Sequence, residues 1–216
     1  PKIKTLYGDF ARKHHVPGVA YGVVVDGELV FAGGVGVQNI ESRTPVTPDS
    51  VYRIASMSKS FAAMAVLKLR DDGKLHLDEP VVTYVPELAN QVYPTRDSAP
   101  ITVRHLLTMS AGLPQDDPWA DRHLDFTPVQ FSEVMAHGLA FSTPPNTRYE
   151  YSNLGYGILG RVITNVSGMP YQQYIRQNIL VPLGMTSSTY DVHQVDPARL
   201  AMGYRRLGDQ WVADPP

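Results

Sequence analysis

The stretch from Ser56 to Asp72 constrains the fold most, because its apolar residues recur at the spacing of a helix that is buried on most sides. These residues are Phe61, Met64, Ala65, Val66, Leu67 and Leu69. Gly73 comes next, at a position where glycine commonly ends a helix. We therefore expect a mostly buried helix over this stretch, with Ser56 and Lys59 near its start.

The composition supports a packed globular chain. The 216 residues suffice for one large domain or two small ones, and 43% of them are hydrophobic against 19% charged. The formal net charge of -2 gives no electrostatic reason to expect nucleic acid or an anionic membrane as a partner. Cysteine is absent, which excludes disulfides, thiolate catalysis and cysteine-ligated metal. No apolar run has the length of a membrane span.

Residues 1–55 are predicted to form an N-terminal helix and a β-hairpin. The predicted elements are a helix at 3–15, strands at 19–25 and 28–37, and a short strand at 51–54. Asp26-Gly27, between the first two strands, is the strongest short signal for a two-residue hairpin turn. The run from Gly33 to Gly36 is compatible with a phosphate loop or with a strand end or bulge. The strand is favoured, because no capped helix follows.

Residues 56–200 are predicted to be mostly helical. After the first helix come a short helix or irregular crossing at 81–86 and helices at 102–107, 127–137, 154–166 and 170–180. The helix at 154–166 contains three glycines, Gly155, Gly157 and Gly160. We expect them to allow close packing against another helix. Residues 201–216 are predicted to begin the return to a sheet, as a strand pair around Gly208-Asp209.

The predicted sheet is incomplete. A single hairpin followed by helices would leave an exposed strand edge, which natural folds normally pair or cover. The sequence ends at Asp214-Pro215-Pro216, in residues typical of a loop. We expect one domain of the α/β (α+β) class overall, with sequence missing on its C-terminal side.

Ser56 and Lys59 are the first candidate catalytic residues. They stand three residues apart, so on a helix both side chains share one face. The first turn of a helix offers unpaired N–H groups and the positive end of the dipole, and an ammonium beside a serine helps to remove its proton. Ser-x-x-Lys alone also occurs by chance, so an ordinary solvated helix start is the alternative.

Tyr151 and Asn153 form the second candidate element. A phenol is a poor base unless a cation stabilises the phenolate, and Lys59 could supply that charge to Tyr151. Tyr151 would then take a proton from Ser56 and return it to a leaving group. Asn153 projects to the same side of an extended stretch, and the Ser56 backbone N–H would form part of an oxyanion hole. The alternatives are that Tyr151 is only a packing aromatic and that Asn153 only caps the helix at Leu154.

Ser56-x-x-Lys59 followed by Tyr151-x-Asn153 resembles the serine β-lactamase and penicillin-binding-protein superfamily. The resemblance is to its branch of class C β-lactamases, D-alanyl-D-alanine carboxypeptidases, D-aminopeptidases and family VIII carboxylesterases. Further segments that resemble the family are Val51–Ala55, Asp72–Pro80, Ile101–Pro114 and Asn153–Tyr156. The resemblance implies a β-lactamase/transpeptidase-like fold, in which an antiparallel sheet is flanked by helices and carries an inserted helical domain.

The resemblance also implies a function, namely two-step acyl transfer with Ser56, Lys59 and Tyr151 as catalytic residues and Asn153 as a substrate-binding residue. It implies no metal and no organic cofactor. Expected substrates are an ester, a D-peptide or a β-lactam, with a carboxylesterase or a D-amino-acid-directed peptidase favoured over a β-lactamase. The alternative is a catalytically weak member that binds, senses or scaffolds.

The family's third motif, a Lys-Thr-Gly or His-x-Gly triplet on a later strand, has no counterpart before Pro216. Expected macromolecular partners are therefore a C-terminal remainder of the same protein or a second copy of the chain. The compartment is open, with a periplasmic or secreted bacterial location slightly favoured over the cytoplasm.

Other polar clusters give weaker signals. The histidines lack partners at metal-ligand spacing, and they include His14, His15, His105, His123 and His137. Four acidic residues lie close together in the sequence, namely Asp116, Asp117, Asp121 and Asp125. They lack the glycine and glutamate of a calcium-binding loop, so a solvated rim explains them better. Trp119 and Phe126 either line the mouth of an acyl pocket or only anchor their loop.

Overall fold

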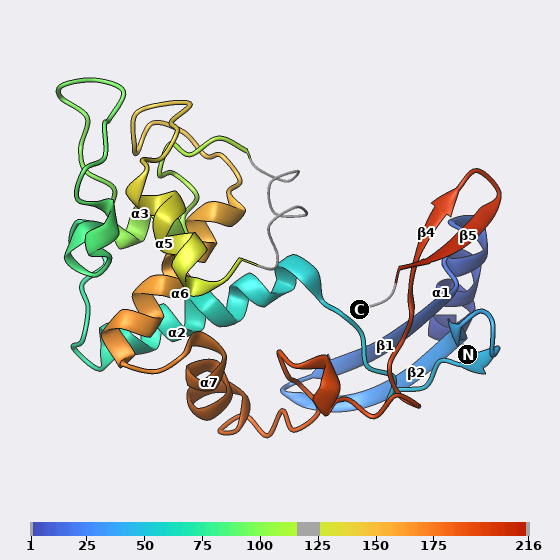
Figure 1. Cartoon of the computed structure of the whole chain (residues 1–216). Coiled ribbons are helices and arrows are strands. Elements are labelled where there is room, and N and C mark those ends of the chain that lie inside the picture. The colour runs from blue at the N-terminus through green and yellow to red at the C-terminus, as the bar shows by residue number, and fades with distance from the viewer. Residues whose placement is uncertain (1, 116–125, 215–216) are drawn as a thin grey trace. The chain divides into compact units, whose positions relative to one another are not determined.

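The computed structural model describes residues 2–115 and 126–214, and these residues form two compact units (Figure 1). The first unit combines residues 1–55 with 187–216, and the second comprises residues 56–186. The predictions made for Asp116, Asp117, Trp119, Asp121, His123 and Asp125 lie outside the described residues.

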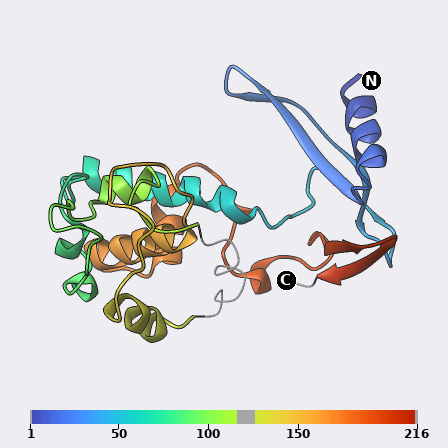
Figure 2. The same cartoon turned by 90° about the horizontal axis from the view of Figure 1, so that it is seen from above.

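The first unit begins with a helix and a hairpin, as predicted. The elements are α1 (Lys2–Lys13), β1 (Gly18–Val25), β2 (Glu28–Asn39) and β3 (Thr44–Pro45), and the strands pair antiparallel in the order β1-β2-β3. Asp26 and Gly27 both have positive φ, 50° and 83°, as a type I′ turn requires. Figure 2 shows α1 beside the hairpin, where Tyr7 stacks on Tyr21 with ring centroids 4.4 Å apart.

The glycine run of β2 is part of the strand and not a phosphate loop. A Cβ at Gly33 would lie 2.7 Å from the Tyr21 hydroxyl, and one at Gly34 would lie 2.4 Å from the carbonyl oxygen of Val46. These glycines are therefore needed because neighbouring groups approach the strand closely. The strand interpretation of this run is confirmed.

The C-terminal strand pair is confirmed as β4 (Gly203–Leu207) and β5 (Gln210–Asp214), while the predicted short strand at 51–54 is wrong. Only Val51 pairs there, in an isolated bridge to Leu200. The Val51 N–H donates to the Arg199 carbonyl at 2.7 Å, and the Ala201 N–H donates to the Val51 carbonyl at 2.9 Å. These bonds hold the chain around residue 200, just after η5 (Val192–Gln194), in the first unit. The observed helical unit thus ends at Thr186, whereas the sequence-based boundary is at 200.

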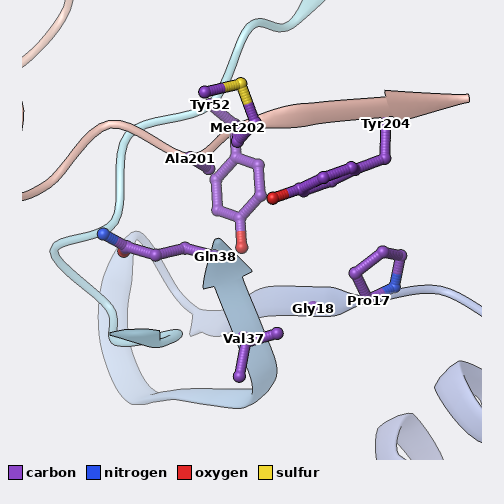
Figure 3. Close-up of a pocket in the computed structure, with 8 residues that line it drawn as sticks. All are labelled: Pro17, Gly18, Val37, Gln38, Tyr52, Ala201, Met202 and Tyr204. Carbon is purple, nitrogen blue, oxygen red and sulfur yellow. The ribbon is translucent and has the colours of Figure 1, made fainter. Parts of the chain in front are cut away.

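A small cavity of about 80 Å³ lies between the end of β2 and the start of β4 (Figure 3). In Figure 3 the Tyr204 hydroxyl points toward the Tyr52 ring, above Val37. Tyr204 accepts the Ile40 N–H at 2.8 Å and donates to the Glu41 carboxylate, and this bond lowers the pKa of Glu41. These two hydrogen bonds join Tyr204 of β4, in the cavity wall, to the residues just after β2.

The second unit is helical around one core. Its helices are α2 (Lys59–Asp71), α3 (Val103–Leu107), α5 (Pro128–Ala136), α6 (Asn153–Ser167) and α7 (Tyr171–Ile175). Its shorter segments are the 3₁₀ turns η1 (Ala55–Ser58), η2 (Val81–Thr83) and η3 (Pro86–Leu88), and the π-helical turn η4 (Arg176–Leu180). The largest fully buried side chains include Leu69 of α2 and Ile158, Leu159 and Ile163 of α6. None of the helices among the described residues is both long and apolar enough to cross a bilayer.

The predicted helix ends are confirmed where local capping decides them. Gly73 has φ +70°, and the Lys74 N–H closes the end of α2 on the Leu69 carbonyl at 2.9 Å. Thr102 is the N-cap of α3 and Thr127 is the N-cap of α5, each in a reciprocal capping box with the residue three positions later. The segment 170–180, predicted as one helix, continues from α7 into the π turn η4.

Of the three glycines in α6, only Gly157 stands in tight contact. A Cβ there would lie 3.0 Å from Cζ of Phe131, while Gly155 and Gly160 would meet their nearest side chains at 3.6 and 3.8 Å. The predicted close packing is therefore real at Gly157, where α6 lies against α5.

Candidate active site

Ser56 and Lys59 stand where a 3₁₀ turn passes into an α-helix. Ser56 belongs to η1 and Lys59 is the first residue of α2, so the nucleophile candidate precedes the α-helix predicted to contain it. A 3₁₀ turn has three residues per turn, which aligns residues three apart. Lys59 Nζ accordingly lies 3.0 Å from Ser56 Oγ. Ala55, just before the serine, has φ +44°, a conformation that costs energy for a residue with a Cβ.

Tyr151 and Asn153 lie where an extended stretch enters α6. The Glu150 N–H donates to the Met109 carbonyl at 2.8 Å and fixes the approach to Tyr151. Ser152 is the N-cap of α6, because its Oγ accepts the Gly155 N–H at 3.0 Å. Asn153 is the first residue of the helix, so the alternative that it caps Leu154 is wrong.

The structure brings all four predicted side chains together. Tyr151 Oη lies 2.6 Å from Ser56 Oγ. Lys59 Nζ donates to Ser56 Oγ at 3.0 Å, to Tyr151 Oη at 2.7 Å and to Asn153 Oδ1 at 2.6 Å. An ammonium carries three N–H donors, so these three oxygens use its whole donor capacity.

The charge of Lys59 is balanced without a carboxylate. Within residues 2–115 and 126–214, Lys59 takes part in no salt bridge. Two aromatic rings lie close instead, with Nζ at 4.8 Å from the ring centroid of Tyr151, whose oxygen it contacts, and 5.8 Å from the ring centroid of Tyr156. Aromatic faces attract cations at such distances.

Tyr156 is the residue near this site that the sequence analysis did not single out. It stands three residues after Asn153 on α6, a spacing that places both on one helix face and that could have suggested it. Its hydroxyl donates to the Leu107 carbonyl at 3.2 Å. Burial raises the pKa of Tyr156, and nearby Tyr149 and Tyr151 add to the rise.

Of the polar clusters that gave weak metal signals, only the histidines other than His123 lie among the described residues. In the part of the chain that the structure describes, no group of three or more His, Asp or Glu side chains is placed to hold a metal ion. His105 instead completes the cap of α3, where its Nδ1 accepts the Thr102 N–H at 3.2 Å. His137 Nδ1 lies 2.7 Å from the Glu133 carbonyl, one helical turn before it.

Comparison with known proteins places this geometry in a family. Residues 3–216 match the profile of the family described as Beta-lactamase. Over the whole chain the sequence is 30% identical to protein flp of Staphylococcus aureus strain MW2, of which it covers 43%.

Solved structures give the same result for the fold. The octameric penicillin-binding protein homologue from Pyrococcus abyssi superposes with a TM-score of 0.83 at 33% identity, over 99% of this chain and 50% of that one. The D-amino acid amidase from Ochrobactrum anthropi SV3 superposes with a TM-score of 0.74 at 30% identity, over 91% of this chain and 55% of that one. The chain thus spans about half the length of these relatives.

The fold is therefore β-lactamase/transpeptidase-like, as expected, and this chain contains a helical part and a partial antiparallel sheet of it. Because the family profile covers nearly the whole sequence, this chain belongs to the β-lactamase family, a family of serine hydrolases.

Proposed function

We propose that this chain carries the nucleophile of a serine hydrolase that forms an acyl-enzyme through Ser56 Oγ on an ester or amide. The observation that carries the proposal is the 2.6 Å contact between Ser56 Oγ and Tyr151 Oη, with Lys59 donating to both oxygens. A free serine hydroxyl is a weak nucleophile, and a base held at hydrogen-bond distance is what activates it.

The proton path follows from the donor count at Lys59. All three of its N–H bonds point at oxygens, so we assign it the role of a cation that stabilises negative charge on Tyr151 Oη. Tyr151 takes the proton of Ser56 as Oγ bonds to the substrate carbonyl carbon, and it returns that proton to the leaving oxygen or nitrogen. In the second step Tyr151 takes a proton from water as the water oxygen attacks the acyl carbon. That proton then returns to Ser56 Oγ as the ester bond breaks.

Two further groups complete the proposed site. Asn153 holds Lys59 through Oδ1, and we propose that its amide also contacts the substrate. The Ser56 N–H lies in the first turn of η1, where backbone N–H groups have no partner within the helix. We assign this N–H to the carbonyl oxygen of the tetrahedral intermediate, as one donor of an oxyanion hole.

For substrate class we propose a carboxylic ester or an amide of a D-amino acid, ahead of a β-lactam. The support is the similarity to the amidase from Ochrobactrum anthropi, a D-amino acid amidase by name, across 91% of this chain. The octameric homologue supports a second proposal, that the whole protein assembles with copies of itself. Because the chain spans about half of such relatives, further sequence of the same protein is also a proposed partner.

The test is covalent labelling read by intact mass. The chain is treated with a fluorophosphonate and, separately, with a fluorescent penicillin, beside Ser56→Ala and the matched control Ser60→Ala on the adjoining turn. We expect a single adduct in the wild type and in Ser60→Ala, and none in Ser56→Ala. An adduct that persists in Ser56→Ala would contradict the proposal, and a folded chain that reacts with neither reagent would favour the binding or scaffold alternative.

Substrate preference is then measured on wild-type protein. Hydrolysis of p-nitrophenyl esters, of D- and L-alanine amides and of nitrocefin is compared at equal enzyme concentration. Faster turnover of ester or D-amide than of nitrocefin supports the proposed class, while a preference for nitrocefin contradicts it.

A further inference from the structure

We infer that Tyr156 is a positioning residue for the proposed chemistry, whose ring face holds the Lys59 ammonium against Tyr151 and Ser56. The inference rests on the proposed function and adds a residue that makes no contact with the reacting atoms. Its basis is the 5.8 Å distance between Lys59 Nζ and the centroid of the Tyr156 ring.

The helix geometry places Tyr156 beside the site. Asn153 and Tyr156 stand three residues apart in the first turns of α6, so they share the face that packs against α2, which carries Lys59. Asn153 holds the ammonium through a hydrogen bond, and Tyr156 adds the face of its ring. The cation therefore has three oxygens around it, one of them the hydroxyl of Tyr151, and the ring of Tyr156 close by.

The Tyr156 ring is itself fixed at its far end. Its hydroxyl donates to the carbonyl of Leu107, the last residue of α3. Carbonyls at a helix end have no partner within the helix, so this bond satisfies one of them. The raised pKa of Tyr156 keeps the hydroxyl protonated and able to donate over the whole neutral range.

The residues on either side of Tyr156 allow this placement. Gly155 is buried against Leu106 of α3, and Gly157 stands against the Phe131 ring of α5 at a Cβ distance of 3.0 Å. A bulkier residue at Gly157 would push α6 away from its neighbour. The sequence Gly155-Tyr156-Gly157 therefore seats the ring between α3 and the Lys59 side chain.

The physical role of the ring is to restrict Lys59. A lysine ammonium is a compact charge on a flexible four-carbon stem, and in water it finds other hydration geometries readily. An aromatic face close to the charge favours the pose in which Nζ reaches Tyr151 and Ser56. Loss of the ring should therefore lower the rate of acylation more than it lowers ground-state binding of substrate.

The experiment compares three variants by the rate constant of fluorophosphonate labelling and by the thermal midpoint. Tyr156→Phe keeps the ring and should retain the rate within about threefold, while Tyr156→Leu should lose about tenfold. Phe131→Leu is the matched control, since Phe131 packs on the same helix at Gly157 but is not among the rings near Lys59. It should lower the thermal midpoint and leave the labelling rate within about twofold of wild type.

A fluorinated series separates ring electrostatics from packing. Phenylalanine analogues with increasing fluorine substitution, placed at position 156, keep the ring shape while weakening the negative potential of its face. We expect the labelling rate and kcat to fall stepwise along the series, with KM changed less. A rate that stays constant across the series, or falls equally in Phe131→Leu, would overturn the inference. Absence of labelling in the wild type would instead contradict the proposed function, so the two failures are distinguishable.

Discussion

The two units of the molecule differ in how completely they bury their apolar side chains. The helical unit, residues 56–186, holds a continuous core to which α2, α3, α6 and α7 contribute fully buried residues. The other unit buries far fewer apolar side chains, and large apolar side chains at the tip of its hairpin are exposed. Leu29 is 65% exposed and Val24 is 62% exposed.

The hairpin tip is apolar on both faces of the sheet. Val24 and Val25 are neighbours on β1 and point to opposite sides of the sheet, and both are exposed. Leu29 and Val30 of β2 are exposed as well, at an irregularity in the strand register. Strands that are apolar on both faces are typical of sheets covered on both sides. The comparison teaches that the helical unit contains its own core and the whole candidate network, while the hairpin contributes little burial of its own.

The largest effect should come from Tyr151→Phe. This variant tests whether the acylation rate of the helical unit can be lost without a loss of its stability. The variant keeps the ring but removes the oxygen that contacts both Ser56 and Lys59. We expect acylation to fall by about 100- to 10,000-fold, the range typical of a lost general base. The urea midpoint should stay at the wild-type value, because the half-buried ring remains. Labelling at the wild-type rate would contradict the role assigned to Tyr151.

The next effect compares the units directly, through Ile158→Ala in α6 and Leu29→Ala in the hairpin. Ile158 is 0% exposed, so its truncation should cost about 2–5 kcal/mol of unfolding free energy. Leu29 is mostly exposed, and its truncation should cost less than about 0.5 kcal/mol. Amide hydrogen exchange, read separately for residues 153–167 and 18–39, measures each unit. Equal losses of unfolding free energy in the two variants would contradict the proposed difference in burial between the units.

A smaller effect, of opposite sign at two positions, should appear within α6. Gly160→Ala places a methyl at an ordinary 3.8 Å from Tyr171 and should stabilise by up to about 1 kcal/mol, the helix propensity difference. Gly157→Ala places it 3.0 Å from Phe131 Cζ, so the ring must shift and the gain is cancelled or reversed. The urea midpoints of the two variants check this. A gain at both positions would mean that α6 and α5 pack less tightly than the structure shows.

The parts of the fold that sequence predicts well are those decided by neighbouring residues. Asp26-Gly27 sets the hairpin turn through positive φ, and Thr127 and Gly73 set helix ends through local hydrogen bonds. The grouping of Ser56 with Tyr151 is predicted from the chemistry of serine, lysine and phenol and from the family resemblance, since no local rule relates residues so far apart in sequence. The roles of these residues stay predictions until labelling tests them.

The remaining features depend on contacts between distant segments. The stretch at 51–54 has strand-like residues, but only Val51 forms a β-bridge, to Leu200. The two compact units divide after Thr186 and not at residue 200. Tyr156 appears in sequence only as part of a family-like segment, and its contact with Lys59 exists because α6 packs beside α2.

The smallest effect concerns His105, whose Nδ1 accepts the Thr102 N–H in the cap of α3. Burial lowers its pKa below the ordinary value of about 6.5, while Asp78 opposes that shift and Arg104 adds to it. As the pH falls, the His105 imidazole therefore takes up a proton at a higher pH in the unfolded chain than in the folded one. The contribution to stability is present above about pH 6.5 and is lost progressively as the pH drops toward the lower folded value.

His105→Gln should reduce this loss, because glutamine also completes a capping box and does not titrate. We expect the fall in urea midpoint between about pH 7.5 and pH 5.5 to be smaller in the variant than in the wild type, with similar midpoints at the upper pH. The matched change at the exposed His193, in the other unit, should leave the fall as in wild type. If the fall in urea midpoint is the same in His105→Gln and His193→Gln, the acid sensitivity of the protein does not arise from the cap of α3.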